Sequence, residues 1–387
     1  MSERRQAVVK NAGMDERRTY TIMHLNDRVA SIHNDGSCVI YKKSFMPYNL
    51  YLDEDVQDLD TRLNNLANFN YWCASRVLSL DRKYAKEILN SLGMKQAVTD
   101  RDRAEIAISY HALSLTDVYW VKSYREKISF DEINLWEHSL ADGFVDVCLR
   151  GKAFTVQNYE LNSSSYAADV SALGVAPKAW IRRNDGFHLL KDGDELEVRN
   201  EILASRILDC FKLDHVEYSP AVYEYDGGSC NVSDSRIITS VDYSIVPYEY
   251  IVIYAENRDA DAVELIKGID SYSYYMMNIA DYLVGNTDRH WGNWGGLVDN
   301  GTNKIIRLHA LMDFNKAFNA YDTLDGAGCL TTSGKSMTQK DAAIEAVKAI
   351  WLNQIKDIDP ALFFDQTSAD MFYNRLNMLI AFDNKKD

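Results

Sequence analysis

The apolar residues of this chain recur with the spacings of both strands and helices, which predicts a mixed α and β structure. Short apolar runs at 20–24 and 38–41, separated by the turn residues Asn34-Asp35-Gly36, predict strands near the amino end. Helical spacing follows and predicts helices at 70–80, 84–92, 103–114 and from Ser129 to about residue 140. The aromatic segment 114–122 is interpreted as packed core.

The middle of the chain predicts a hairpin, a helix and further strands. Residues 178–181 and 187–191 are short apolar segments joined by Asn184-Asp185-Gly186, so Lys191 is expected to end the second strand of a hairpin. Apolar positions then form one stripe of a helix from Glu195 to about residue 211. Strands are expected at 216–218, 221–225 and 237–241.

The last part of the chain is predicted to be helical around one loop and one hairpin. The apolar spacing of 274–284 predicts a helix that ends at Gly285. Asn300-Gly301 is a strong turn signal between 295–298 and 304–308, so these two segments are expected to pair. Closing helices are predicted at 341–352 and 369–382.

The composition is that of a folded, acidic protein. The 387 residues, of which 47% are hydrophobic, suffice for two or three domains and exclude a disordered chain. Asp and Glu number 57 against 42 Lys and Arg, a net charge of −15. A nonspecific attraction to nucleic acid or to an anionic membrane is therefore not expected, although a local basic patch is not excluded.

Targeting signals and cysteines add a prediction of location. No apolar run approaches the roughly twenty residues of a membrane helix, and the basic segment 1–18 lacks the apolar core of a signal peptide. The six cysteines are scattered without a Cys-x-x-Cys pair. This pattern predicts reduced thiols in a cytoplasmic protein, with neither a disulfide framework nor a zinc site.

Candidate catalytic residues lie in the loop before the predicted hairpin and just after it. The loop 286–293 places Asp288 five residues before Asn293, and Asp313 follows the hairpin. Phosphoryl transfer needs a carboxylate near the attacking hydroxyl and oxygen ligands for magnesium. Asp288 is therefore the candidate catalytic residue, and Asn293 and Asp313 are candidate Mg²⁺ ligands. Without context, the same spacing also fits a polar loop closed by its own hydrogen bonds.

Kinases also pair a strand lysine with a glutamate on the next helix. Lys191 is placed for this role, with its ammonium toward ATP phosphates; a solvated lysine at the rim of a sheet is the alternative. Glu201 and Glu197, one helical turn apart, are both candidate partners. Arg289 and His290 either contact a phosphate or hold the loop in place. We favour the second role, because an arginine beside a carboxylate fixes its rotamer.

These segments resemble the HipA-like kinases, a bacterial group distantly similar to phosphatidylinositol 3- and 4-kinases. The resemblance rests on Asn-Thr-Asp-Arg-His-x-x-Asn at 286–293, on Asp-Phe-Asn-Lys-Ala-Phe at 313–318 and on the segments around Lys191 and Glu201, and covers roughly residues 160–345. It implies an α+β, two-lobed protein-kinase-like fold, ATP with Mg²⁺, and a serine or threonine hydroxyl as acceptor. It favours Glu201 over Glu197. Asn315 stands where protein kinases place a glycine, which puts a kinase-type flip of this segment in doubt.

The resemblance also implies three regions. These are a mixed amino-terminal accessory domain at 1–155, a nucleotide-binding amino lobe at 156–255 with its adenine-binding connection near 242–250, and a catalytic, metal-binding carboxyl lobe at 256–387. Residues 163–174 take the place of the phosphate loop, although they contain one glycine, Gly174; a polar surface loop is the alternative. HipA-like kinases carry an inactivating phosphoserine near this loop. Ser171 is the corresponding candidate for autophosphorylation, and Ser171 and Gly174 are candidate ATP contacts.

The sequence thus predicts a cytoplasmic, HipA-like, ATP- and Mg²⁺-dependent serine/threonine kinase. The founding members are toxin kinases of bacterial persistence, which implies an antitoxin-like partner. Two other hypotheses stay open: a nucleotide-binding partner module of a toxin-antitoxin-like system with weak catalysis, and a kinase of a small molecule or lipid headgroup. The joint presence of Lys191, Glu201, Asp288, Asn293 and Asp313 argues against a degenerate site.

Overall fold

The computed structural model describes residues 19–54, 58–91, 99–137, 145, 148–151, 176–319, 323–332, 336–352 and 355–383. The chain forms two compact units. The first contains Met1–Arg182, Thr239–Ser244 and Asn300–Asn303, and the second contains Arg183–Ile238, Ile245–Asp299 and Lys304–Asp387. Within the described residues, no helix is both long enough and apolar enough to cross a bilayer.

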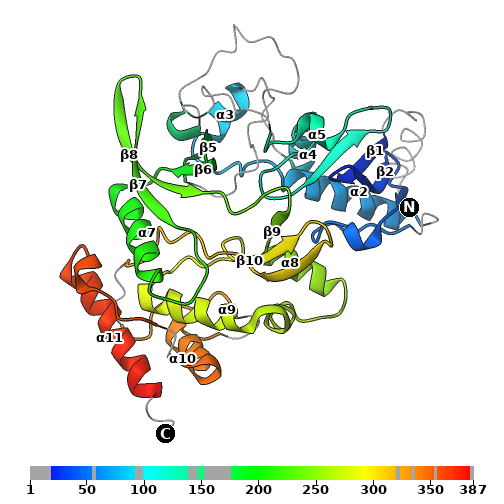
Figure 1. Ribbon diagram of the computed structural model, residues 1–387. Helices are drawn as coiled ribbons and strands as arrows, with labels where there is room; N and C mark the ends of the chain where they lie inside the picture. Colours follow the sequence, from blue (N-terminus) through cyan, green and yellow to red (C-terminus); the bar gives the residue numbers. More distant parts are fainter. Residues whose placement is uncertain are drawn as a thin grey trace. The chain divides into compact units, whose positions relative to one another are not determined.

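The first unit is built on a four-stranded antiparallel sheet of order β3-β2-β1-β4. Its strands are β1 (Thr19–His24), β2 (Asp27–His33), β3 (Cys38–Ile40) and β4 (Tyr119–Ser123). The helical elements of this unit are η1 (Lys43–Phe45), α2 (Leu59–Ala74), α3 (Ala85–Ser91), α4 (Asp100–Ser109) and α5 (Phe130–Ile133). Helices α2 and α4 pack together (Figure 1), and Ile22, Trp72 and Trp120 are fully buried in the core. Strand β5 (Lys178–Arg183) is the next strand along the chain and belongs to a second four-stranded sheet, of order β5-β6-β8-β7.

The second unit begins with the strands β6 (Gly186–Lys191), β7 (Tyr218–Tyr225) and β8 (Gly228–Arg236) and the helix α7 (Glu195–Leu208). Strand β8 lies between β6 and β7 and is antiparallel to both. In this register Lys191 lies opposite Ser233, and Tyr218 lies opposite Ser235. Helix α7 packs on β7 and β8 (Figure 1), so side chains of the helix and of the sheet meet at Lys191.

The rest of the second unit is mainly helical. Its elements are β9 (Tyr243–Pro247), α8 (Tyr248–Glu256), α9 (Ala262–Val284), β10 (Gly295–Asp299), β11 (Lys304–Leu308), α10 (Gln339–Ile350), η2 (Pro360–Leu362) and α11 (Gln366–Asp383). The long helix α9 packs against α8, α10 and α11, as Figure 1 shows. Its buried face and Trp294, Phe314 and Phe372, all fully buried, form the core around the candidate catalytic loop.

The observed elements confirm the mixed α and β class and most of the predicted positions. Strands β1 and β3, helix α3, the stop at Gly285 and the β10–β11 pairing lie where the sequence predicts them. The helix predicted at 70–80 is wrong in extent, because α2 begins after Asp58, whose side chain accepts from the backbone N–H groups of Asp60 and Thr61.

The strand predicted at 237–241 is wrong. The strand in this region is β8, which ends at Arg236 and carries the polar sequence Ser233-Asp234-Ser235 in buried positions. Ser233 and Asp234 are hydrogen-bonded to Glu201 and His188, so polar side chains occupy buried positions and β8 lacks the apolar alternation by which strands are recognised. Strand β2 also lacks a clear apolar alternation, but for a different reason: its four consecutive residues 29–32 are all buried.

Candidate active site

The loop that carries Asp288 is positioned by the end of α9. Gly285 has φ +63°, a left-handed conformation that ends the helix and suits glycine. The backbone N–H of Asn286 then donates to Asp281 O at 2.9 Å, and the Asn286 side chain donates to Asp281 Oδ1 at 3.1 Å. Asn286 is fully buried, so the first residue of the loop is part of the core.

Arg289 joins this loop to two other segments. Its guanidinium donates to both carboxylate oxygens of Asp281, with Nε–Oδ2 and Nη2–Oδ1 distances of 2.9 Å. Its Nη1 donates to Asn293 O at 3.0 Å and also to Met312 O, next to Asp313 in the chain. Arg289 is 2% exposed, and its charge is compensated by Asp281, which is 4% exposed. Arg289 therefore holds the loop in place, the role favoured from the sequence, and its carboxylate partner lies on α9.

Asp288 and Asn293 lie five residues apart in the loop. Asn293 is buried, and its Nδ2 donates to Asp288 O at 2.9 Å, which orients the amide so that its oxygen is the remaining acceptor. The Asp288 N–H donates to Asn286 Oδ1 at 3.4 Å. Asp288 is half-buried, and among the described residues no cation pairs with its carboxylate. These two hydrogen bonds hold the backbone of Asp288.

Lys191 forms a buried ionic cluster with Glu201 and Asp313. Its Nζ lies 3.0 Å from Glu201 Oε1 and also donates to Asp313 Oδ1. Lys191 is 7% exposed and Glu201 1% exposed, so Lys191 is not a solvated rim residue. Burial by itself would lower the pKa of Lys191, but the carboxylates of Asp313 and Glu201 outweigh burial and raise that pKa. Ser233, opposite Lys191 in the sheet, donates to Glu201 Oε2 at 2.6 Å.

The structure decides between the two glutamates of α7 as partners of Lys191. Glu201 makes the contact, whereas the Glu197 carboxylate pairs with Lys316. Both residues lie on α7, which begins after Asp194, whose side chain accepts from the Glu197 N–H.

Asp313 is held in an unusual conformation by a residue that the sequence argument missed. Its φ is +63°, in the left-handed region, where Asp is tolerated better than most residues. Its N–H donates to Tyr218 Oη at 3.1 Å, and the Tyr218 N–H donates to Ser205 Oγ at 3.0 Å. Burial and the nearby Glu201 raise the pKa of Tyr218, so its hydroxyl is neutral. No local pattern points to Tyr218, because its contact with Asp313 spans 95 residues.

The charges and donor atoms of the cluster are compatible with Mg²⁺ and a nucleotide. One ammonium faces the buried carboxylate of Glu201 and the half-buried carboxylate of Asp313, which leaves a net charge of about −1 that favours a cation. The Asn293 amide oxygen and the Asp313 carboxylate are hard oxygen donors of the kind magnesium prefers. In the part of the chain that the structure describes, no group of three or more His, Cys, Asp and Glu side chains could hold a metal ion.

The other predicted site residues are only partly placed. Ser171 and Gly174, and with them the predicted phosphate loop, lie outside the described residues. His290 is exposed, and its Nδ1 accepts from the Gly292 N–H at 3.0 Å. Trp294 is fully buried against Tyr248, with ring centroids 4.0 Å apart, and Trp291 is 46% exposed.

Comparisons with known proteins give similarities of fold only. No protein-family model matches the chain, and a search of curated protein sequences finds no match. Among solved structures, the Helicobacter pylori proinflammatory kinase CtkA is similar, with 15% identity and a TM-score of 0.41 over 54% of this chain and 90% of that chain. The Shewanella oneidensis MR-1 toxin-antitoxin protein HipA, solved with HipB and operator DNA, is similar with 11% identity and a TM-score of 0.48, over 95% of this chain and 97% of that chain.

Proposed function

We propose that this protein is an ATP- and Mg²⁺-dependent kinase that phosphorylates a serine or threonine hydroxyl of a protein. Because both TM-scores lie below 0.5, the function is inferred from the geometry of the site. The observation that carries the proposal is the buried cluster in which Lys191 contacts both Glu201 and Asp313. A buried lysine between a helix glutamate and the aspartate that follows a catalytic loop is the arrangement that kinases use to hold phosphates.

Each residue of the site has a distinct role in the proposed reaction. Glu201 orients Lys191, whose ammonium binds phosphate oxygens of ATP in exchange for its contact with Asp313. Asn293 and Asp313 would hold Mg²⁺, which supplies neutralisation of the phosphate charges. Arg289 positions these groups relative to one another, because it contacts the backbone carbonyl of Asn293 and that of Met312, the residue before Asp313.

Asp288 accepts the proton in this proposal. The bond from the acceptor oxygen to the γ-phosphorus forms while the bond from the γ-phosphorus to the β–γ bridging oxygen breaks, and ADP leaves with that electron pair. The proton of the acceptor hydroxyl passes to the Asp288 carboxylate, which has no cationic partner among the described residues. An unpaired carboxylate is a better proton acceptor than one held in an ion pair.

The regions named from the sequence are kept as part of the proposal: an accessory domain at 1–155, a nucleotide-binding lobe at 156–255 and a catalytic lobe at 256–387. We also propose, from the sequence resemblance, that phosphorylation of Ser171 inactivates the protein. The same resemblance leads us to propose an antitoxin-like partner. Peptide mass spectrometry after incubation with ATP and Mg²⁺ tests the first, and copurification from the native source tests the second.

The test of the function is phosphate transfer from radiolabelled ATP. The purified protein is incubated with γ-labelled ATP, Mg²⁺ and a mixture of serine- and threonine-containing peptides, with Asp288→Asn protein as the control. We expect label on the peptides or on the protein itself with the unmodified chain only. Nucleotide binding without any transfer would instead favour the nucleotide-binding module, and label on lipid headgroups or small alcohols alone would move the acceptor to that class.

A further inference from the structure

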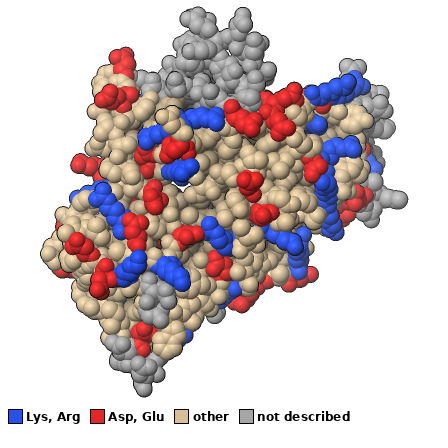
Figure 2. All heavy atoms as spheres, viewed as in Figure 1, with Lys and Arg blue, Asp and Glu red and all other residues tan. Residues whose placement is uncertain are grey.

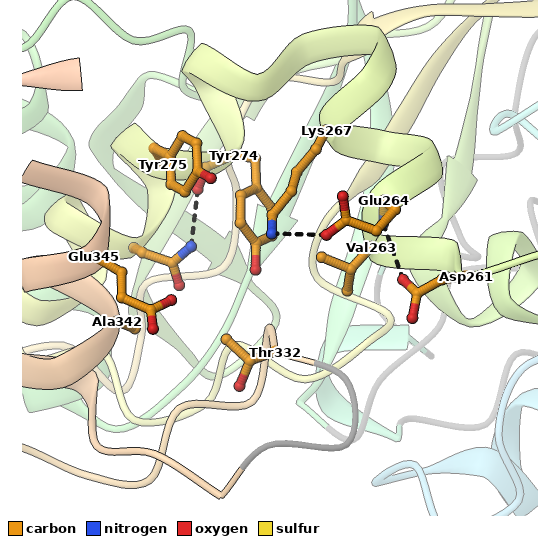
Figure 3. A pocket seen from close by; sticks show the side chains of 10 residues that line it. Asp261, Val263, Glu264, Lys267, Tyr274, Tyr275, Thr332, Ala342 and Glu345 are labelled. Atoms are coloured by element: carbon orange, nitrogen blue, oxygen red, sulfur yellow. Dashed lines mark hydrogen bonds and ion pairs between the residues drawn. The ribbon is translucent and has the colours of Figure 1, made fainter. Parts of the chain in front are cut away.

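The segment 324–332 runs beside two helices of the unit that carries the site. From α9, the Tyr282 hydroxyl donates to the first backbone carbonyl of this segment at 2.6 Å. At the other end of the segment, Figure 3 shows Tyr274 of α9 and Thr332 around one cavity, which Ala342 of α10 also lines. The segment therefore lies against α9, with α10 close by.

The first residue of α10, Gln339, binds this segment through both its backbone and its side chain. The helix begins there because Thr338 and Asp341 form a capping box. The Gln339 N–H, which has no partner inside the helix, donates to Ala327 O at 2.8 Å. The Gln339 side chain returns to the same residue, since its Oε1 accepts from the Ala327 N–H at 3.0 Å. Two hydrogen bonds therefore fix Ala327 to the start of α10.

The same side chain reaches the loop that carries Asp288. Gln339 Nε2 donates to Asn286 O at 2.5 Å, and Gln339 is buried. Asn286 is the residue that accepts from the Asp288 N–H through its Oδ1, and its Nδ2 donates to Asp281 of α9. One buried amide thus joins the segment 324–332 to the residue that holds the backbone of Asp288.

A second polar bridge joins this segment to α9. Thr331 Oγ1 donates to Asn278 Oδ1, and Asn278 Nδ2 donates to Tyr274 O at 2.9 Å. Both bridges line one small cavity of about 10 Å³, whose walls include Asn278, Asn286, Thr331 and Gln339. A cavity of this size holds at most a single water, so these buried groups depend on one another for their hydrogen bonds.

We propose that Gln339 is a positioning residue of this site, which fixes the loop that carries Asp288 against the segment 324–332. The inference rests on the proposed kinase function and concerns the geometry of its proton acceptor. Gln339 acts through Asn286 and not on the reacting atoms. Without its amide, Asn286 O would lose a buried donor, and Asp288 would no longer be held in one position.

The expected effect is on the chemical step. A displacement of a catalytic group by about 1 Å can lower the rate by about 100-fold. Lys191 and Asp313, two of the three residues proposed to hold ATP and Mg²⁺, lie outside the loop. Loss of the Gln339 amide should therefore lower kcat and leave KM for ATP nearly unchanged.

The test compares three variants of the full chain. Gln339→Met keeps the length of the side chain and removes both of its hydrogen-bonding groups. Gln339→Glu keeps the acceptor for the Ala327 N–H and removes the donor to Asn286 O, so it isolates the contact with the loop. Thr338→Ala is the matched control, because it removes the capping box at the start of α10 and leaves the Gln339 amide in place.

Hydrogen exchange measured by mass spectrometry reports on the loop without any catalysis. We expect residues 285–294 to exchange faster in both Gln339 variants and at the unmodified rate in Thr338→Ala. In transfer assays with γ-labelled ATP, both Gln339 variants should lose about tenfold in kcat, with KM for ATP within about twofold, whereas Thr338→Ala should keep both constants. Urea unfolding identifies a variant that has lost its fold, and the other Gln339 variant then decides.

Four outcomes would overturn the inference. Unchanged exchange of 285–294 in a folded Gln339 variant would detach Gln339 from the loop, and faster exchange with an unchanged kcat would make the position of the loop irrelevant to transfer. Equal effects in Thr338→Ala would reduce the result to the stability of α10. Failure of both Gln339 variants to fold would leave Gln339 a purely structural role.

The inference and the kinase proposal fail in different ways. Faster loop exchange confined to the Gln339 variants, in a protein that transfers no phosphate even when unmodified, would support the link between Gln339 and the loop. The same result would count against the kinase proposal.

Discussion

Asp313 shows how single residues store strain at the site. Its left-handed backbone places the carboxylate against Lys191, while its N–H is satisfied by the buried hydroxyl of Tyr218. Most residues lose about 1 kcal/mol or more in this conformation, whereas Asp and Asn visit it more readily. The conformation persists because Lys191 and Tyr218 fix both the side chain and the backbone of Asp313.

Asp313→Asn is expected to abolish catalysis and keep the fold. Asparagine tolerates the left-handed conformation and preserves the shape of the side chain, but it removes the charge proposed to bind Mg²⁺. We expect phosphate transfer to fall at least about 100-fold, with an unchanged circular dichroism spectrum. Turnover close to that of the unmodified protein would remove Asp313 from the metal site.

Tyr218→Phe is expected to lower kcat through the backbone of Asp313. The change keeps the ring but removes the acceptor for the Asp313 N–H, which leaves a buried donor unsatisfied at a cost of about 1–3 kcal/mol. We expect kcat to fall and the Mg²⁺ concentration for half-maximal activity to rise. Tyr223→Phe, on the same strand, is the control and should change neither quantity. A purely structural role for Tyr218 would lower stability without moving the Mg²⁺ dependence.

At the scale of elements, α7 uses two glutamates one turn apart for different contacts. Glu201 faces the buried lysine at the end of β6, and Glu197 faces Lys316, which follows Asp313 by three residues in the chain. The helix therefore contacts both the strand lysine and the segment after Asp313, the proposed Mg²⁺ ligand. Any tilt of α7 would change the position of Lys191.

Glu201→Gln and Glu197→Gln form a matched pair that separates these roles. Glu201→Gln removes a buried charge that orients Lys191, so kcat/KM for ATP should fall at least about tenfold, equivalent to roughly 1.4 kcal/mol. Glu197→Gln removes a more exposed carboxylate and should reduce activity by less. Steady-state kinetics at fixed Mg²⁺ measures both. An intact Glu201→Gln enzyme beside an impaired Glu197→Gln enzyme would reverse the assignment.

At the scale of the whole molecule, the surface is strongly acidic but not uniformly so. Lysine and arginine side chains are interspersed with carboxylates on the face drawn in Figure 2. With a net charge of −15, the protein attracts basic partners over a distance, and added salt weakens that attraction.

Acidification is expected to destabilise the protein through buried histidines. Burial lowers the pKa of His24 and of His309 to about 4, below the ordinary value of 6.5. Between these values the unfolded chain binds more protons than the folded chain, so stability falls as the pH falls through this window. From pH 7 to pH 5 the loss should be about 2 kcal/mol for each residue.

Urea unfolding at the two pH values measures this loss. His309→Asn should unfold with a smaller difference between pH 7 and pH 5, because the titrating group is gone. His290→Asn, at an exposed histidine of the same unit, should keep the full difference. An unchanged pH dependence in His309→Asn would show that other groups govern acid stability.

Local chemistry explains what the sequence alone determined. Apolar spacing and turn residues give the strand that ends at Lys191, the helix stop at Gly285 and the hairpin after Asn293, because each depends on neighbouring residues. The spacing of Asp288, Asn293 and Asp313 identified the candidate site for the same reason. The residues by themselves left open whether Glu197 or Glu201 pairs with Lys191.

Only the tertiary structure decided the contacts between distant segments. Lys191 meets Asp313 across 122 residues, and Tyr218 meets it across 95, separations at which no local pattern operates. Helix α7 brings Glu201 to Lys191 through its packing on β7 and β8, and Arg289 finds its carboxylate on α9. A buried polar group needs a hydrogen-bonding partner, and the partners of these groups come together only when the chain packs.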